Sequence, residues 1–128
     1  TCNSSSERDE ELTTLQRDIQ KEKDKVTRDI NELRHDIDGQ LEEVEIQLNQ
    51  ADEKVAGELK DLRRRLIAER DTVDQLLTKV RNSTEDTWNE INRDVKTEMN
   101  EGKIEFSRVK QKIKDELDTI KQKIDSKI

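Results

Sequence analysis

The side chains that could do chemistry are few and lie far apart along the chain. His35 is the only histidine, and it stands between Arg34 and Asp36 with no cysteine nearby. A zinc site needs three or four histidine or cysteine ligands, and a catalytic triad needs a nucleophile within reach, so we expect a solvated histidine. Carboxylate neighbours such as Glu42 and Glu43 lack the apolar pocket that would separate their pKa values. The sequence therefore predicts no enzyme, no metal site and no cofactor.

Basic residues are concentrated at one place only. Arg63, Arg64 and Arg65 are adjacent, but Asp61 and Glu69 flank them, and the chain carries a net charge of −7. Nucleic-acid binding draws most of its affinity from clustered lysine and arginine. We therefore expect a solvated helix face and no nucleic-acid partner.

Cys2 is the only cysteine, and a short polar stretch rich in serine and acids follows it over residues 3–11. A cysteine followed by such a stretch and then by helix resembles the processed start of bacterial lipoproteins, in which the cysteine is acylated. The resemblance implies a lipid attached to Cys2, with residues 1–10 as a flexible tether. It also implies a place in the bacterial cell envelope, membrane-anchored and facing the periplasm or the cell surface. The alternative is an ordinary exposed cysteine in a frayed tail of a cytoplasmic protein.

The composition indicates an all-α chain. Charged residues make up 45% of the sequence and aromatic residues 2%, proline is absent, and only three glycines occur. Apolar residues nevertheless recur at steps of three and four from Leu12 to Val80, which is the period of a narrow helical seam. We call this seam, with the apolar residues that continue it after residue 87, the apolar stripe. Such a seam must be covered by another helix, because burial of each apolar side chain gains about 1.5–3 kcal/mol.

The spacing changes in the last third of the chain. Val95, Phe106, Leu117 and Ile128 are eleven residues apart. An eleven-residue repeat has about 3.67 residues per turn and favours a straight or slightly right-handed bundle.

Residues 11–128 are expected to form one helical coiled-coil domain with a turn near residues 82–84. Asn82 can end a helix there, and Ser83 or Thr84 can begin the next. Gly39 is a weaker candidate for an earlier turn. The predicted fold is an elongated antiparallel coiled-coil helical hairpin or, with the second turn, a three-helix bundle.

Trp88 is the only tryptophan, and its large surface predicts a core anchor one turn into the last helix. The expected structural core combines it with members of the apolar stripe. These residues are Leu33, Ile37, Leu59, Leu62, Leu66, Leu77, Trp88, Ile91, Val95, Phe106, Ile113, Leu117, Ile120 and Ile124. Gly102 also falls on the stripe, where it would permit close contact between helices.

A resemblance to a known family rests on residues 58–77, on the junction 83–91 with Trp88, and on Val95 and Phe106. This combination resembles a family of small bacterial coiled-coil proteins induced by stress. The resemblance implies a role in cell protection without an enzymatic step.

Two classes of function follow from these features. The first is a structural or interaction protein of the cell envelope with a stress-protective or scaffolding role. Its partners would be the membrane, through the lipid on Cys2, and a second copy or another protein, through the seam. The second is reversible binding of lipid surfaces by amphipathic helices, which also carry eleven-residue repeats.

Overall fold

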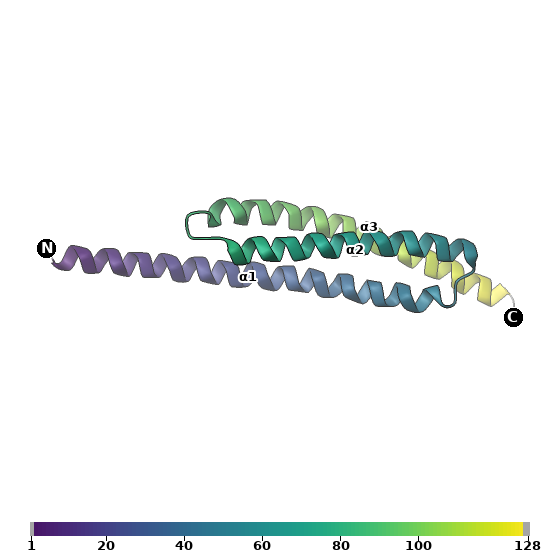
Figure 1. The fold of residues 1–128 in the computed structure, drawn as a ribbon. Helices are drawn as coiled ribbons and strands as arrows, with labels where there is room; N and C mark the ends of the chain where they lie inside the picture. Colours follow the sequence, from purple (N-terminus) through teal and green to yellow (C-terminus); the bar gives the residue numbers. More distant parts are fainter. Residues whose placement is uncertain (1, 127–128) are drawn as a thin grey trace.

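The protein consists of three long helices that run up, down and up (Figure 1). The computed structural model describes the backbone of residues 2–126 and, within it, the side chains of residues 11 and 13–122. Helix α1 spans Cys2–Leu48, α2 spans Glu53–Asn82 and α3 spans Trp88–Ser126. The prediction of an all-α, elongated helical bundle is confirmed, in its three-helix form.

The first turn lies at residues 49–52 and not at Gly39. Helix α1 continues through Gly39, and a Cβ added there would meet no atom within 4 Å, so this glycine lies on an open helix face. The turn is fixed instead by Asp52, whose Oδ1 accepts a hydrogen bond from the Val55 backbone N–H at 2.9 Å. An aspartate in this position satisfies one of the unpaired donors at a helix start. A single glycine inside a helix costs only about 1 kcal/mol, which did not suffice to end α1.

The segment expected to be a flexible tether is helical in the structure. Helix α1 begins at Cys2 and includes the backbone of residues 2–10. This stretch contains neither proline nor glycine, so none of its residues interrupts the helix. The side chain of Cys2 lies outside the described residues.

The second turn lies at residues 83–87, next to the position predicted from sequence. Ser83 is buried, and its hydroxyl donates to the Val80 carbonyl oxygen at 2.6 Å. The Thr84 backbone N–H donates to Thr87 Oγ1 at 2.9 Å. Hydroxyl side chains therefore satisfy the backbone groups that the two helix ends leave unpaired.

The core is one apolar column between the three helices. Most residues of the predicted core are buried: Leu33, Ile37, Leu59, Leu62, Leu66, Leu77, Trp88, Val95, Phe106, Ile113 and Ile120. Ile91 and Leu117 are partly buried and pack against this column, and the side chain of Ile124 lies outside the described residues. Val26, Ile30, Val44, Val55, Val73, Leu76, Val80, Met99 and Val109 complete the column.

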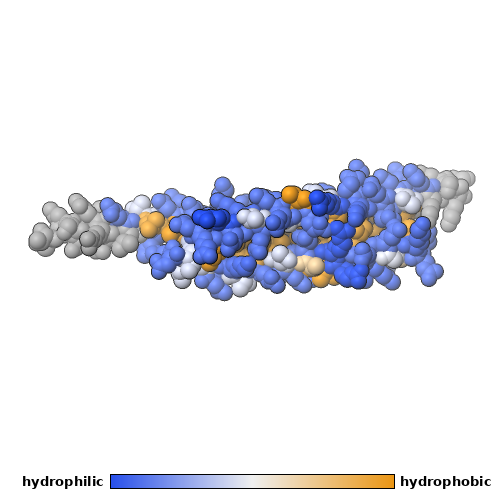
Figure 2. Space-filling model, turned by 90° about the horizontal axis from the view of Figure 1, so that it is seen from above, coloured by the Kyte–Doolittle hydropathy of each residue, from blue (hydrophilic) through white to orange (hydrophobic). Residues whose placement is uncertain are grey.

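The outer surface is charged over most of its area. In the view from above, hydrophilic side chains cover the rod and apolar ones show only between them (Figure 2). Among the described side chains, the exposed large hydrophobic ones are spread over all three helices: Leu15, Ile46, Ile67 and Ile104. The apolar material of the stripe is therefore used mainly inside the bundle.

Candidate functional site

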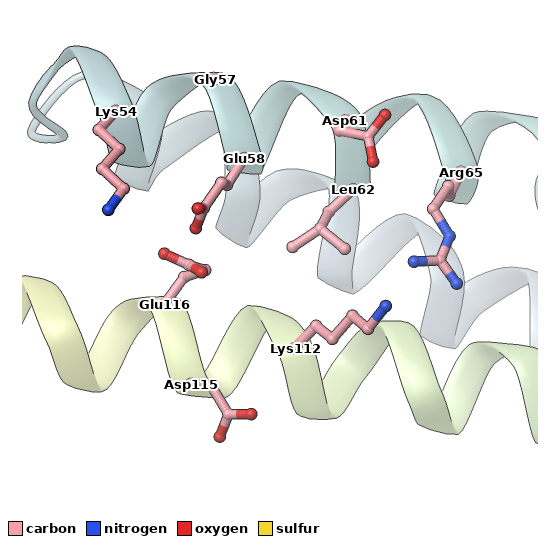
Figure 3. A pocket seen from close by; sticks show the side chains of 9 residues that line it. All are labelled: Lys54, Gly57, Glu58, Asp61, Leu62, Arg65, Lys112, Asp115 and Glu116. Carbon is pink, nitrogen blue, oxygen red and sulfur yellow. The ribbon is translucent and has the colours of Figure 1, made fainter.

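A groove runs between the first half of α2 and the last third of α3, and we call it the α2–α3 groove (Figure 3). It encloses about 630 Å³, with Leu62 the one large apolar side chain that lines it. Its lining residues are Lys54, Gly57, Glu58, Asp61, Leu62, Arg65, Lys112, Asp115 and Glu116. Charged groups of both signs thus surround a small apolar surface.

Two carboxyl groups face each other across this groove. Glu58 of α2 and Glu116 of α3 point towards one another from the two helices (Figure 3). The hydrogen bond between them raises the pKa of Glu116 from its ordinary 4.5 to about 7. Partial burial of Glu116 and the negative charge of Glu58 act in the same direction, while Lys54 opposes them. Protonated Glu116 can therefore donate to the Glu58 carboxylate near neutral pH.

A second carboxyl pair lies farther along the same two helices. Burial, followed by the negative charge of Glu105, raises the pKa of Glu69, and the Arg65 guanidinium partly offsets this. Arg65 itself forms an ion pair with Glu105. Glu69 Oε2 is buried and accepts no hydrogen bond from the described residues.

Gly102 lies beside this buried carboxylate. A Cβ built on Gly102 would lie 3.5 Å from Glu69 Oε2 and 3.8 Å from Leu33 Cδ2. These are ordinary van der Waals distances, so an alanine would fit at this point, where α1, α2 and α3 approach one another. The glycine of the apolar stripe therefore lies at a close helix contact, and it faces a carboxylate as well as an apolar side chain.

Trp88 anchors the turn between α2 and α3 to α1. Its indole is fully buried, and Nε1 donates to Glu22 Oε2 at 2.7 Å. Lys23 Nζ lies 5.8 Å from the centre of the ring and donates to the Ser83 carbonyl oxygen at 2.7 Å. The tryptophan is thus a packing and hydrogen-bonding residue, and this polar contact fixes where α1 passes the turn.

The arginine cluster is divided among three carboxylates. Arg63 Nη1 lies 2.9 Å from Glu45 Oε1 of α1, Arg64 pairs with Asp61 and Arg65 pairs with Glu105. Each of the three positive charges is therefore matched within the chain.

His35 is exposed on α1 and borders a second groove, of about 760 Å³, between α1 and α3.

In the part of the chain whose side chains are described, no three His, Cys, Asp or Glu residues are placed to hold a metal ion. Within the described residues, no helix has an apolar stretch long enough to cross a membrane.

The acid pairs were not predicted from the sequence, because only carboxylates adjacent along the chain were compared. A signal was present nevertheless: eleven residues separate Glu58 from Glu69 on α2, and eleven separate Glu105 from Glu116 on α3. Eleven residues are three helical turns, so each helix carries two glutamates on one face. The antiparallel alignment of α2 and α3 then brings the two faces together.

No protein-family model matches the chain, and no curated protein or solved structure is significantly similar to it. The resemblance to stress-induced coiled-coil proteins therefore stays a prediction.

Proposed function

We propose that the protein is a non-enzymatic structural component of the bacterial cell envelope, a charged helical rod that is held by a lipid on Cys2. The rod would have a stress-protective or scaffolding role. The observation that carries the proposal is that the three helices bury the apolar seam against one another and present a charged surface to the solvent.

The position of Cys2 supports an anchoring role. Glu22 and Lys23 contact the turn between α2 and α3, so the earlier residues of α1 extend beyond that turn (Figure 1). About 20 helical residues at 1.5 Å each span about 30 Å. A lipid on Cys2 would therefore hold the bundle away from a membrane on a helical stalk.

Acylation can be tested by mass spectrometry of the protein isolated from its native cells. A diacyl or triacyl group on Cys2 is the expected finding, and an unmodified thiol would contradict the anchor. Membrane fractionation of the Cys2→Ser variant, with Ser6→Ala as the matched control, gives the second test. The Cys2→Ser variant should leave the membrane fraction while the control stays in it.

Binding of lipid surfaces by the helices themselves is the competing function. The purified Cys2→Ser chain, floated with liposomes of neutral or anionic lipid, separates the two functions. We expect no binding, because the seam is buried in the bundle and the net charge of −7 repels anionic lipid. Flotation with the liposomes would favour the lipid-surface function over the anchored rod.

A further inference from the structure

The two acid pairs stand on the same side of one helix–helix contact. Glu58 faces Glu116 across the α2–α3 groove (Figure 3), and three turns away on α2 the buried Oε2 of Glu69 is within reach of the charge of Glu105. The α1–α2 contact carries oppositely charged pairs, namely Arg34–Asp74, Arg63–Glu45 and Arg70–Asp38. The α2–α3 contact carries the ion pairs Arg65–Glu105 and Lys79–Glu98 beside its acid pairs. Like charges facing each other across a contact oppose helix pairing unless a proton removes one of them.

We propose that these two acid pairs make the α2–α3 contact pH-dependent. The contact is tight while each pair holds a proton, and it loosens when both carboxyls of a pair are ionised. This pH dependence is a property of the folded chain itself, so it does not depend on the envelope role proposed above.

The charged neighbours of Glu116 do not cancel the effect. On α2, Lys54, Asp61 and Arg65 line the groove, and on α3, Lys112 and Asp115 do so. The hydrogen bond to Glu58 raises the pKa of Glu116 more than Lys54 lowers it, and Asp115 acts in the same direction as the hydrogen bond. Among the described side chains, none from α1 lines the α2–α3 groove, so the first acid pair depends on α2 and α3.

The surroundings of Glu69 lead to the same result. Arg65 forms an ion pair with Glu105. Arg70, which follows Glu69 in the chain, lies 4.0 Å from Asp38 of α1. Glu69 Oε2 and Leu33 Cδ2 of α1 would lie 3.5 Å and 3.8 Å from a Cβ built on Gly102. Ionisation therefore leaves a buried carboxylate oxygen with no hydrogen-bond donor among the described residues.

The direction of the pH effect follows from proton binding. Both shifted carboxyls have a pKa above the ordinary value of 4.5, so the folded chain holds protons that the unfolded chain has released. The resulting stabilisation is complete below about pH 4.5 and disappears as the pH rises through about 7, the pKa of Glu116. The contact is therefore weaker in mildly alkaline solution than in mildly acidic solution.

Thermal unfolding followed by circular dichroism tests the proposal on the whole chain. The Tm should fall by about 3 °C between pH 5.5 and pH 8, an order-of-magnitude figure for a groove open to solvent. Glu116→Gln removes one of the two titrating groups and keeps a donor towards Glu58, so part of this fall should disappear. Glu101→Gln removes an equal charge from an exposed position of α3 and should retain the fall. Equal falls in all three proteins would overturn the proposal.

A distance measurement locates the change. Spin labels at Lys60→Cys and Gln111→Cys, in a Cys2→Ser background, report on the α2–α3 contact through exposed positions. Labels at Glu42→Cys and Ala68→Cys report on the α1–α2 contact in the same way. The α2–α3 distance distribution should broaden from pH 5.5 to pH 8, while the α1–α2 distribution stays narrow. Broadening at both contacts or at neither contradicts a device confined to the acid pairs.

Discussion

The two antiparallel contacts of α2 differ in their electrostatics although both are built on the same apolar column. Towards α1, arginines meet carboxylates, as in Arg34 Nε to Asp74 Oδ1 at 3.1 Å. Towards α3, the ion pairs Lys79–Glu98 and Arg65–Glu105 occur together with the acid pairs. Hydrophobic packing therefore closes both contacts, and charge makes only one of them sensitive to pH.

Core substitutions on the two outer helices should have the largest effects. Ile37 of α1 and Ile113 of α3 are 0% and 1% exposed, so Ile37→Ala and Ile113→Ala should each cost about 2–5 kcal/mol. At pH 8 the looser α2–α3 contact can relax around its cavity, so Ile113→Ala should cost less than Ile37→Ala. Urea unfolding at pH 5.5 and pH 8 measures both costs. A difference between the two variants that is the same at both pH values would contradict the comparison.

The core could be predicted from the sequence because helical periodicity depends only on local spacing. Leu59, Leu62 and Leu66 lie on the stripe and are buried. Leu76 is also buried but follows the stripe less regularly, since Leu77 beside it already occupies the expected position. The first turn is predicted wrongly because Gly39 was its only signal, whereas the capping bond of Asp52 decides where α2 begins.

The acid pairs required more than periodicity. Whether Glu58 meets Glu116 depends on how far α2 and α3 slide along each other, and the packing of Gly102 and Trp88 against the other helices helps to fix this alignment. Spacing along one helix does not contain that information. The only sign of this alignment in the sequence is that the two glutamates of α2 and the two glutamates of α3 have the same eleven-residue spacing.

Glycine substitutions should have intermediate effects and separate the two contacts further. Gly39→Ala places a Cβ in open space and should stabilise the chain by about 1 kcal/mol through helix propensity. Gly102→Ala has the same propensity gain, but its Cβ would lie 3.5 Å from Glu69 Oε2 and shield a buried carboxylate further from water. The gain at Gly102 should therefore be smaller, above all at pH 8. Thermal unfolding of both variants checks the order, and a larger gain at Gly102 would show that the carboxylate is not constrained there.

Surface ion pairs should have the smallest effects. Arg70→Gln removes the pair with Asp38, and Lys79→Gln removes the pair with Glu98; each should cost less than about 0.5 kcal/mol because the side chains are largely exposed. Added salt should reduce both costs. Urea unfolding at low and high salt measures them. A cost well above 1 kcal/mol at either contact would mean that ion pairs, and not the apolar column, hold the helices together.

Titration of the Glu116 carboxyl carbon by nuclear magnetic resonance tests most directly whether the α2–α3 contact holds a shared proton. The expected midpoint is about 7, and Glu58→Gln should lower it because the hydrogen bond to the Glu58 carboxylate and the like charge, which both raise the pKa, are removed. A midpoint at the ordinary value of 4.5 in the unmodified chain would contradict the account.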